Sequence, residues 1–415
     1  MKSFKIKTLG CKVNQYESQL MREGLFRSGY EEQDNGEPVD ICIINTCTVT
    51  KKADDESRWL IRNMQKSHPK AKIFVTGCYA QDNGDELAKL PGVSIVKNSH
   101  KNRIAQFLTP ESDAISGISA FAGRTRAYIK IEDGCDNRCS FCKVWQVRGR
   151  ARSRPSGEII EETKALLERG YKELVLIGVC LGAYGKDNGT SVSDLIADIQ
   201  ALKGDFRIRL SSIEVTDITK SLEHLLSVSK KLCPHLHIPL QSGDDEILKA
   251  MNRNYTSAYY VDAVDRFKSS INNFCVTTDV IIGFPGETRK QFENTINVID
   301  KIKPLKTHIF PFSPRPGTRA ADLSGQLTRE EMQRRMLAIR EAANAASYKC
   351  RLQYTAKALR VLAEHKRDKT KGLLQGCADN YIKVNFKGPD ELMNKFVQIK
   401  INGIKENCAE AELWT

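Results

Sequence analysis

The sequence lacks long apolar runs. No stretch approaches the roughly 18 consecutive apolar residues that a membrane-spanning helix needs. The first seven residues, MKSFKIK, also lack the apolar segment of a secretory signal peptide. We therefore expect a cytoplasmic protein without a membrane partner.

Several common catalytic motifs are missing as well. The sequence contains no GxxxxGK(S/T) phosphate-binding loop, no GxGxxG segment and no GxSxG elbow. The hydrolase and nucleotidase classes thereby lose their main support.

Acidic residues are too few to balance the basic ones. The 64 Lys and Arg residues exceed the 51 Asp and Glu residues, which gives a formal net charge of +13. Such an excess favours a polyanionic partner, and nucleic acid is the first candidate. With 40% hydrophobic and 28% charged residues the composition is otherwise ordinary, and 415 residues suggest two or three domains.

Cysteine, in contrast, is abundant, with 13 residues. In a reducing compartment thiols stay reduced, and clustered cysteines more often bind metal than form disulfides. The odd number also argues against a complete set of disulfides.

Three cysteines recur at the same place in a repeated pattern. Short apolar strands, each followed by a helical stretch, are expected at residues 4–9, 40–45 and 72–76. Cys11, Cys47 and Cys78 come directly after them, and alternating strands and helices predict a parallel sheet whose carboxyl edge gathers such loops. Three thiolates there suit an iron–sulfur cluster with one iron left open. The alternative is unrelated buried cysteines, as we expect for Cys42 inside the second strand.

A second α/β block follows a small, polar stretch at residues 99–123 that we expect to be a linker. Its expected strands lie at residues 127–131, 173–177, 206–210, 236–239, 276–282 and 306–310. Six strand–helix units are too few for an eight-unit barrel and predict a partial (β/α)6 barrel over residues 124–350. Short β-like runs after residue 354 predict a small C-terminal β-barrel, a shape that often binds nucleic acid. The fold class is thus α/β, with a Rossmann-like N-terminal domain, and the expected domains are 1–115, 121–350 and 353–415.

The most specific motif is Cys135-Asp-Asn-Arg-Cys139-Ser-Phe-Cys142, directly after the first strand of the expected barrel. Three thiolates this close can hold one cluster and leave its fourth iron open. Structural zinc is the alternative, but it takes four protein ligands, and no His or Cys follows Cys142 closely enough to complete the set.

This loop after the first strand of a partial barrel resembles that of the radical S-adenosylmethionine superfamily. Together with the segments TLGCKVNQ (8–15), NTCTVT (45–50) and TGCYAQ (76–81), it makes the whole chain similar to the methylthiotransferases of that superfamily. The resemblance implies a cysteine-bearing N-terminal domain, a radical domain, and a C-terminal TRAM domain that holds RNA and matches least well. It also implies two [4Fe-4S] clusters and S-adenosylmethionine. One cluster would sit on Cys135, Cys139 and Cys142 and chelate S-adenosylmethionine, and the auxiliary cluster on Cys11, Cys47 and Cys78 would carry the sulfur.

Other stretches at the ends of expected strands also match the family. By this resemblance the S-adenosylmethionine pocket is lined by Ser212, Glu214, Gln241, Ser242 and Asp279. Gly283 and Gly286 would instead allow close approach of the backbone.

Two departures from the family stand near the radical-cluster loop. Residues 143–147 read KVWQV, where the family has an apolar stretch with Pro and an aromatic, so packing over the cluster or the fit of substrate changes. Cys180 stands where Asn or His is expected, and we do not expect it to be a cluster ligand.

Four arginines follow the same loop at alternate positions, namely Arg148, Arg150, Arg152 and Arg154. The guanidinium fork suits phosphate and carboxylate, so we expect contact with RNA phosphate or S-adenosylmethionine, the alternative being a solvated charge run. His235 and His237 share one face of a strand, where we expect packing inside the barrel rather than metal binding.

The resemblance implies methylthiolation of a tRNA base at adenine C2. The segments LGAYG, LSSIE and HIFPFS are most similar to the branch that acts on N6-threonylcarbamoyladenosine beside the anticodon. Branches that act on isopentenyladenosine in tRNA or on an aspartate of a ribosomal protein are alternatives, as is a non-catalytic iron–sulfur protein that binds RNA or transfers electrons. The expected partners are the tRNA anticodon stem-loop and an electron donor such as flavodoxin, with the enzyme itself a monomer.

Overall fold

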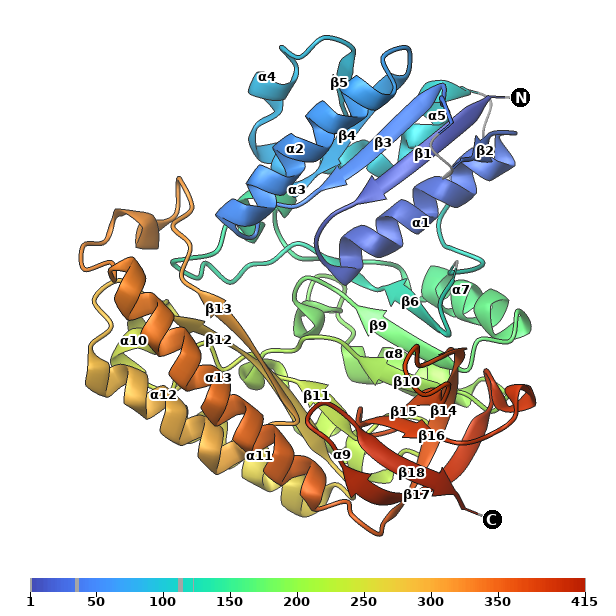
Figure 1. The fold of residues 1–415 in the computed structure, drawn as a ribbon. Coiled ribbons are helices and arrows are strands. Elements are labelled where there is room, and N and C mark those ends of the chain that lie inside the picture. Colours follow the sequence, from blue (N-terminus) through green and yellow to red (C-terminus); the bar gives the residue numbers. More distant parts are fainter. Residues whose placement is uncertain (1, 34–36, 111–114, 122, 415) are drawn as a thin grey trace.

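The computed structural model describes residues 2–33, 37–110, 115–121 and 123–414. An N-terminal sheet lies above a central set of strands and helices, and a small β-barrel lies against the lower part of that central unit (Figure 1). In the described part of the chain, no helix is both long and apolar enough to cross a membrane.

The N-terminal unit is a five-stranded parallel sheet of order β2-β1-β3-β4-β5. Its strands are β1 (Ser3–Thr8), β2 (Glu31–Glu32), β3 (Ile41–Thr46), β4 (Lys72–Gly77) and β5 (Val93–Ile95). Its helices are α1 (Lys12–Arg27), α2 (Lys51–Ser67), α3 (Cys78–Asp82), α4 (Gly84–Leu87), the 3-10 turn η1 (Asn98–Arg103) and α5 (Ile104–Leu108). Ile41 and Ile43 of β3 pack with residues of α1 and α5, while Cys42 and Ile44 pack with residues of α2. Burial on both faces explains the continuous apolar run of β3 and puts Cys42 in the core, as expected.

The expected linker is partly wrong. Its first part forms η1 and α5, and Ile104 and Ala105 are buried in the same cluster as Phe4 and Leu25. Two apolar side chains in a polar stretch are enough to bind this segment to α1. Residues 111–114 and 122 of the expected linker lie outside the described residues.

The central unit contains the six expected parallel strands, in sequence order around an open barrel. They are β6 (Arg126–Lys130), β9 (Glu173–Ile177), β10 (Arg207–Leu210), β11 (His235–His237), β12 (Cys275–Ile282) and β13 (Lys306–Pro311). They form two three-stranded sheets, joined by the single bridges Ile208–Leu232 and Ser212–His237. The partial barrel expected from the six units is therefore confirmed.

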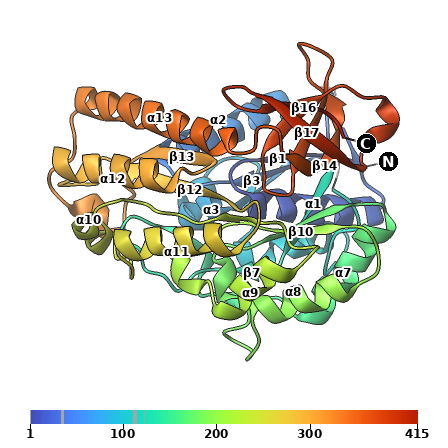
Figure 2. The same ribbon diagram turned by 90° about the horizontal axis from the view of Figure 1, so that it is seen from below.

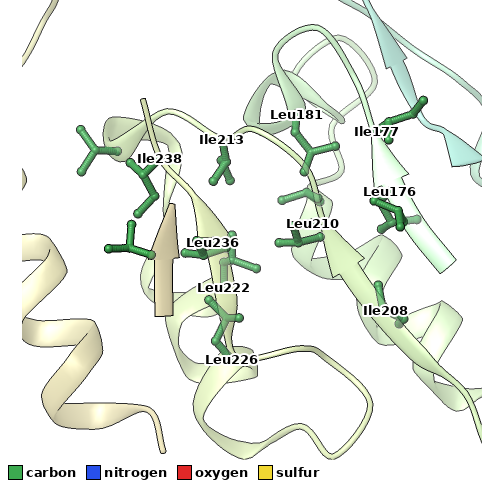
Figure 3. Packing of buried hydrophobic residues seen from close by; sticks show 14 of the residues in the cluster. Leu176, Ile177, Leu181, Ile208, Leu210, Ile213, Leu222, Leu226, Leu236 and Ile238 are labelled. Atoms are coloured by element: carbon green, nitrogen blue, oxygen red, sulfur yellow. The ribbon is translucent and has the colours of Figure 1, made fainter. Parts of the chain in front are cut away.

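Helices cover the outside of these strands (Figure 2). They are α7 (Ser156–Glu168), α8 (Val192–Ala201), α9 (Lys220–Val228), α10 (Asp245–Ala250), α11 (Ser257–Ser270), α12 (Arg289–Ile302) and α13 (Arg329–Leu352). Shorter elements are β7 (Glu132–Asp133), α6 (Val144–Arg148), β8 (Arg152–Ser153), η2 (Leu181–Ala183), η3 (Val215–Asp217) and η4 (Arg319–Asp322). The sequence predicts helices near residues 158–169, 192–202, 218–229, 245–251, 289–302 and 329–348, so α11 has no counterpart among them. Figure 3 shows Leu210 of β10 and Leu236 of β11 packed near Leu222 of α9, which is how the outer helices bind the strands.

The C-terminal unit is a closed five-stranded barrel of order β14-β15-β16-β18-β17, which confirms the small barrel predicted there. Its strands are β14 (Ala358–Arg367), β15 (Leu374–Ala378), β16 (Lys383–Phe386), β17 (Phe396–Ile404) and β18 (Ala409–Leu413), with the turn η5 (Asp390–Leu392). The sequence predicts β-like runs at residues 358–363, 381–386 and 396–401, so β15 and β18 have no counterpart among them.

This barrel docks on the amino ends of the central strands. The Arg207 guanidinium donates to the Asp379 carboxylate (2.6 Å) and to the carbonyl of Cys377 (2.8 Å). Arg209 donates to the carbonyls of Asp379 (2.9 Å) and Ala378 (3.1 Å). Both arginines also bind Glu173, the first residue of β9, which is completely buried.

Candidate functional site

The first candidate site lies at the carboxyl edge of the N-terminal sheet. Because β1, β3 and β4 are neighbours, Cys11, Cys47 and Cys78 end up at one place, as the repeated pattern predicted. Cys11 is exposed, while Cys47 and Cys78 are each 5% exposed.

Glycine precedes two of these cysteines for a steric reason. Gly10 and Gly77 have φ values of +95° and +93°, a region that other residues rarely adopt. A Cβ on Gly10 would lie 2.8 Å from the Cys47 sulfur, and one on Gly77 would lie 2.3 Å from the Thr46 carbonyl oxygen. The Gly-Cys pairs therefore let the cysteine loops approach one another.

Asn14 holds two of the loops together. Its side-chain amide donates to the carbonyls of Leu9 (2.8 Å) and Thr46 (2.9 Å), and the Asn45 amide donates to the Asn14 carbonyl (2.9 Å). The residues before Cys11 and Cys47 are thus fixed relative to α1.

The second candidate site is the loop that carries Cys135, Cys139 and Cys142 after β6. The Cys135 N–H donates to the Gly149 carbonyl (3.0 Å), and the Ser140 hydroxyl donates to the Ala250 carbonyl (2.8 Å). The loop is therefore fixed both to the chain that follows it and to the end of α10.

One cavity of about 200 Å³ joins the two sites. It is bordered by Cys78 of the first triad and by Cys142 of the second. Its other walls are Thr48, Val49, Thr50, Phe141, Lys143, Val144, Gln241, Asp279, Ile281, Phe310, Pro311, Phe312 and Ser313. Two cysteine triads, far apart in sequence, thus face one space at the carboxyl end of the barrel.

Contacts between the N-terminal and central units close the sides of this cavity. The buried Arg315, after β13, donates to the Thr48 hydroxyl (2.7 Å) and the Asp54 carboxylate (2.5 Å). Lys143 pairs with Asp82 of α3 at 2.5 Å. The unusual KVWQV segment therefore supplies a charge that ties the radical-cluster loop to the N-terminal unit.

Each triad fits a four-iron cluster in its donor chemistry, because such clusters are held by thiolates on separate iron atoms. Structural zinc takes four ligands on one atom. Among the described residues, no group of three or more His, Cys, Asp or Glu side chains is placed to hold a single metal ion. Burial raises the pKa of the Cys47 and Cys142 thiols to about 12. Binding of a cluster at these thiols would therefore release their protons.

The four arginines after the loop divide into two kinds. Arg150 and Arg152 are exposed, as a phosphate contact requires. Arg148 is buried, where it binds Glu17 (3.1 Å) and Asp133 (2.8 Å), and Arg154 pairs with the buried Glu162. The prediction of RNA contact is therefore wrong for Arg148 and Arg154, because their guanidinium groups are satisfied inside the protein.

The five residues expected around S-adenosylmethionine are also divided. Gln241 and Asp279 line the shared cavity, and Glu214 lines a second cavity beside Cys139. Ser212 is partly buried and bridges to His237. Ser242 is completely buried, and its hydroxyl lies 3.4 Å from that of Thr295. Ser242 thus fixes its loop to α12 and cannot touch a ligand in the cavity, which corrects the prediction for this residue.

Cys180 lies next to Cys135 without completing the triad. A hydrogen bond from the Cys180 thiol lowers the pKa of Cys135, and the same contact raises the pKa of Cys180. The Cys180 sulfur also lies 3.7 Å from the Asp217 carboxylate.

The two strand histidines have neighbours inside the barrel. His235 stacks on Tyr381 of the C-terminal barrel, with ring centroids 4.4 Å apart. The His237 Nε2 lies 3.1 Å from the Asp279 carboxylate and its Nδ1 lies 2.9 Å from the Thr277 hydroxyl. His237 thus orients a residue that lines the cavity.

Several site residues were missed by sequence reasoning. Glu17 and Arg253 were not among the predicted residues: Glu17 pairs with Arg148, and Arg253 donates to the Cys139 sulfur. Phe310 and Phe312 lie within the HIFPFS segment, so their aromatic character was a usable signal.

Glu132, just before the radical-cluster loop, provides a test of these electrostatics. Burial raises its carboxyl pKa to about 8, and one of its oxygens accepts from the Cys180 N–H at 2.8 Å. A raised carboxyl pKa stabilises the fold below the unfolded value, and this contribution is lost as the pH rises from about 4.5 to about 8. Between these two pH values the free energy of unfolding is expected to fall by about 1.4 kcal/mol per pH unit.

We expect Glu132→Gln to remove this slope, so that the melting temperature of the metal-free variant falls less between pH 5 and pH 8 than that of the wild type. Glu168→Gln, at an exposed position of α7, is the control and should keep the wild-type slope. Equal slopes in wild type and Glu132→Gln would show that this carboxyl is not protonated by burial.

Comparisons with known proteins agree with this arrangement. Residues 129–299 match the family described as "Radical SAM superfamily", and residues 3–97 match "Uncharacterized protein family UPF0004". The two matches contain the two cysteine triads.

Relatives extend over nearly the whole chain. "Threonylcarbamoyladenosine tRNA methylthiotransferase MtaB" of Thermotoga maritima is 37% identical over 98% of this chain and 96% of its own. "tRNA-2-methylthio-N(6)-dimethylallyladenosine synthase" of Fusobacterium nucleatum is 34% identical over 100% of this chain and 99% of its own.

A solved structure shares the fold. That of the radical S-adenosylmethionine methyltransferase TsrM from Kitasatospora setae, with cobalamin and a [4Fe-4S] cluster bound, has a TM-score of 0.57 and covers 77% of each chain. Because the sequence identity is only 13%, the similarity shows a shared fold and nothing about activity.

Proposed function

This chain belongs to the radical S-adenosylmethionine methylthiotransferases, and from that premise we propose that it converts N6-threonylcarbamoyladenosine beside the tRNA anticodon to its 2-methylthio derivative. The enzyme uses S-adenosylmethionine and a [4Fe-4S] cluster, as its family does. We further propose a second, auxiliary [4Fe-4S] cluster on Cys11, Cys47 and Cys78.

The observation that carries this proposal is the cavity shared by both triads. Methylthiolation needs a sulfur source and a radical source beside the same carbon atom. Cys78 and Cys142 border one space, so groups held by the two triads would both face a base placed there. An electron carrier or a structural zinc protein has no need of such a space.

When bound, S-adenosylmethionine and the two clusters would supply a methyl group, one-electron cleavage and a transferable sulfur. The chain's own residues orient these groups. Gln241 and Asp279 offer an amide and a carboxylate on the cavity wall beside Cys142, and His237 holds the Asp279 carboxylate in place. The Lys143–Asp82 and Arg315–Asp54 pairs hold the N-terminal and central units together beside the cavity.

We also propose three domains, at residues 1–115, 121–350 and 353–415. The C-terminal barrel would be a TRAM domain, and it would contact RNA together with Arg150 and Arg152. The net charge of +13 suits tRNA because neutralised phosphates release counterions. We also propose a cytoplasmic monomer that takes electrons from a carrier such as flavodoxin.

Phe310 provides a test of substrate placement. Its ring is 39% exposed on the cavity wall, whereas Phe312 is held edge-to-face against Phe284, with ring centroids 5.6 Å apart. An exposed ring can stack on a base, a contact worth about 1–3 kcal/mol. We expect Phe310→Ala to raise the KM for tRNA roughly 5- to 150-fold by that energy, while cleavage of S-adenosylmethionine without tRNA is unchanged.

Phe107→Ala is the matched control, because Phe107 is also exposed, at 55%, but lies on α5 away from the cavity. An unchanged KM in Phe310→Ala would mean that the base does not stack on this ring.

The function itself is tested by anaerobic expression in a bacterium that lacks methylthiotransferases, followed by mass spectrometry of digested tRNA. We expect new 2-methylthio-N6-threonylcarbamoyladenosine. A methylthio group on the isopentenyl nucleoside alone would assign the enzyme to the branch of the Fusobacterium relative, and unchanged tRNA would overturn the tRNA proposal.

A further inference from the structure

We propose that Arg148 and Arg253 are positioning residues that each donate a hydrogen bond to one cysteine of a triad and thereby raise the reduction potential of the cluster held there. The inference rests on the proposed two-cluster function. It adds a role for two buried arginines, each of which donates to a cysteine sulfur.

Arg148 reaches across from the central unit to the N-terminal triad. It is the last residue of α6, six residues after Cys142, yet its Nε donates to the Cys78 sulfur at 3.3 Å. Its other nitrogens bind Glu17, Asp133 and the Asn14 side-chain oxygen, the last at 2.6 Å. The side chain is only 2% exposed, so these partners fix the donor toward Cys78.

Arg253 makes the equivalent contact at the other triad. It follows α10, and its Nη1 donates to the Cys139 sulfur at 3.3 Å. The Glu214 carboxylate binds Nη2, and the Tyr255 hydroxyl lies 3.3 Å from Nε. With 5% of its side chain exposed, Arg253 is fixed in the same way by a partly buried carboxylate and a second polar group.

These contacts have a defined physical effect. A reduced cluster carries one more negative charge than an oxidised one, and hydrogen bonds to its sulfur ligands stabilise the reduced form more. Because both guanidinium groups are buried, water does not screen them, and their effect is strong at the nearest sulfur. Since Arg148 contacts the triad that is remote in sequence, its loss should move the auxiliary cluster and not the radical cluster.

The experiment is a redox titration followed by electron paramagnetic resonance on the full-length protein. Two backgrounds isolate the clusters: one replaces Cys135, Cys139 and Cys142 by alanine, and the other replaces Cys11, Cys47 and Cys78. Arg148→Gln and Arg253→Gln are introduced into each. Arg335→Gln is the matched control, because Arg335 is also buried in an ion pair, with Glu287, but donates to no cysteine.

We expect each variant to shift only its own cluster to a more negative potential. The ratio of reduced to oxidised cluster at a fixed potential should fall on the order of tenfold, or about 59 mV for a one-electron couple. Arg148→Lys and Arg253→Lys keep the positive charge, so we expect them to lower the potential less than the glutamine variants do. They replace a glutamine variant that does not bind a cluster.

The outcomes separate the inference from the function. Unchanged potentials in variants that bind their cluster would overturn the inference. So would equal shifts of both clusters in one variant, or an equal shift in Arg335→Gln. The two-cluster function would stand in each case. A merely structural role would lower the melting temperature without moving a potential. If the N-terminal triad binds no cluster in the background without Cys135, Cys139 and Cys142, the two-cluster function fails, and so does the role proposed for Arg148. The role of Arg253 is still tested by the potential of the cluster at the other triad.

Discussion

Replacing Cys47 by alanine is expected to lower methylthiolation of tRNA at least about 100-fold, because loss of a ligand should exceed the 10- to 100-fold cost of losing a group behind one. The remaining Cys11 and Cys78 would leave two irons of the auxiliary cluster without protein ligands. The radical-cluster triad is untouched, so cleavage of S-adenosylmethionine should persist. Mass spectrometry of tRNA nucleosides and of the cleavage product measures the two activities separately.

Cys42→Ala is the matched control for this experiment. Cys42 lies within β3 and packs in the core under α2, whereas Cys47 follows the carboxyl end of that strand. We expect this variant to keep its methylthio product. Full product from Cys47→Ala would contradict the auxiliary cluster.

The second large effect concerns Glu173 and stability. Glu173→Gln is expected to destabilise the protein by about 3–5 kcal/mol, the usual cost of removing one partner from a buried ion pair. The completely buried carboxylate binds Arg207 at 2.5 Å and Arg209 at 2.7 Å, so its loss removes a charge partner from two buried guanidinium groups, of which Arg207 keeps its pair with Asp379. Differential scanning calorimetry of the metal-free protein measures the change.

The same carboxyl has a pH signature with a defined sign. Burial alone would raise the pKa of Glu173, but Arg207, Arg209 and Arg126 hold it well below its usual range. Its contribution to stability is therefore present above the usual carboxyl pKa and is lost as the pH falls toward the lowered value. Glu173→Gln should lack this acid-side loss, whereas Glu161→Gln, whose side chain is 72% exposed on α7, should behave as the wild type. A normal melting temperature in Glu173→Gln would contradict this account.

Local patterns were sufficient to predict the cysteine edge of the N-terminal sheet. Alternating strands and helices determine a parallel sheet, and a parallel sheet brings Cys11, Cys47 and Cys78 to one edge whatever the details of packing. The partial barrel followed from the same alternation.

Side-chain direction could not be predicted in this way. Gln241, which has a φ of +63°, lines the cavity, while its neighbour Ser242 is completely buried. Arg148 and Arg150 differ in the same way, because α6 ends at Arg148 and Gly149 takes a φ of +77°. Contacts between remote segments, such as Arg148 with Glu17, depend on domain docking and leave no periodic signal.

The contacts that attach the C-terminal barrel tolerate changes in its sequence. Of the four bonds from Arg207 and Arg209 to that barrel, three go to main-chain carbonyls and only one goes to a side chain, that of Asp379. A carbonyl is present whatever residue carries it, so most substitutions that keep this turn also keep the attachment. The sequence of this turn can therefore change while the barrel keeps its attachment to Arg207 and Arg209.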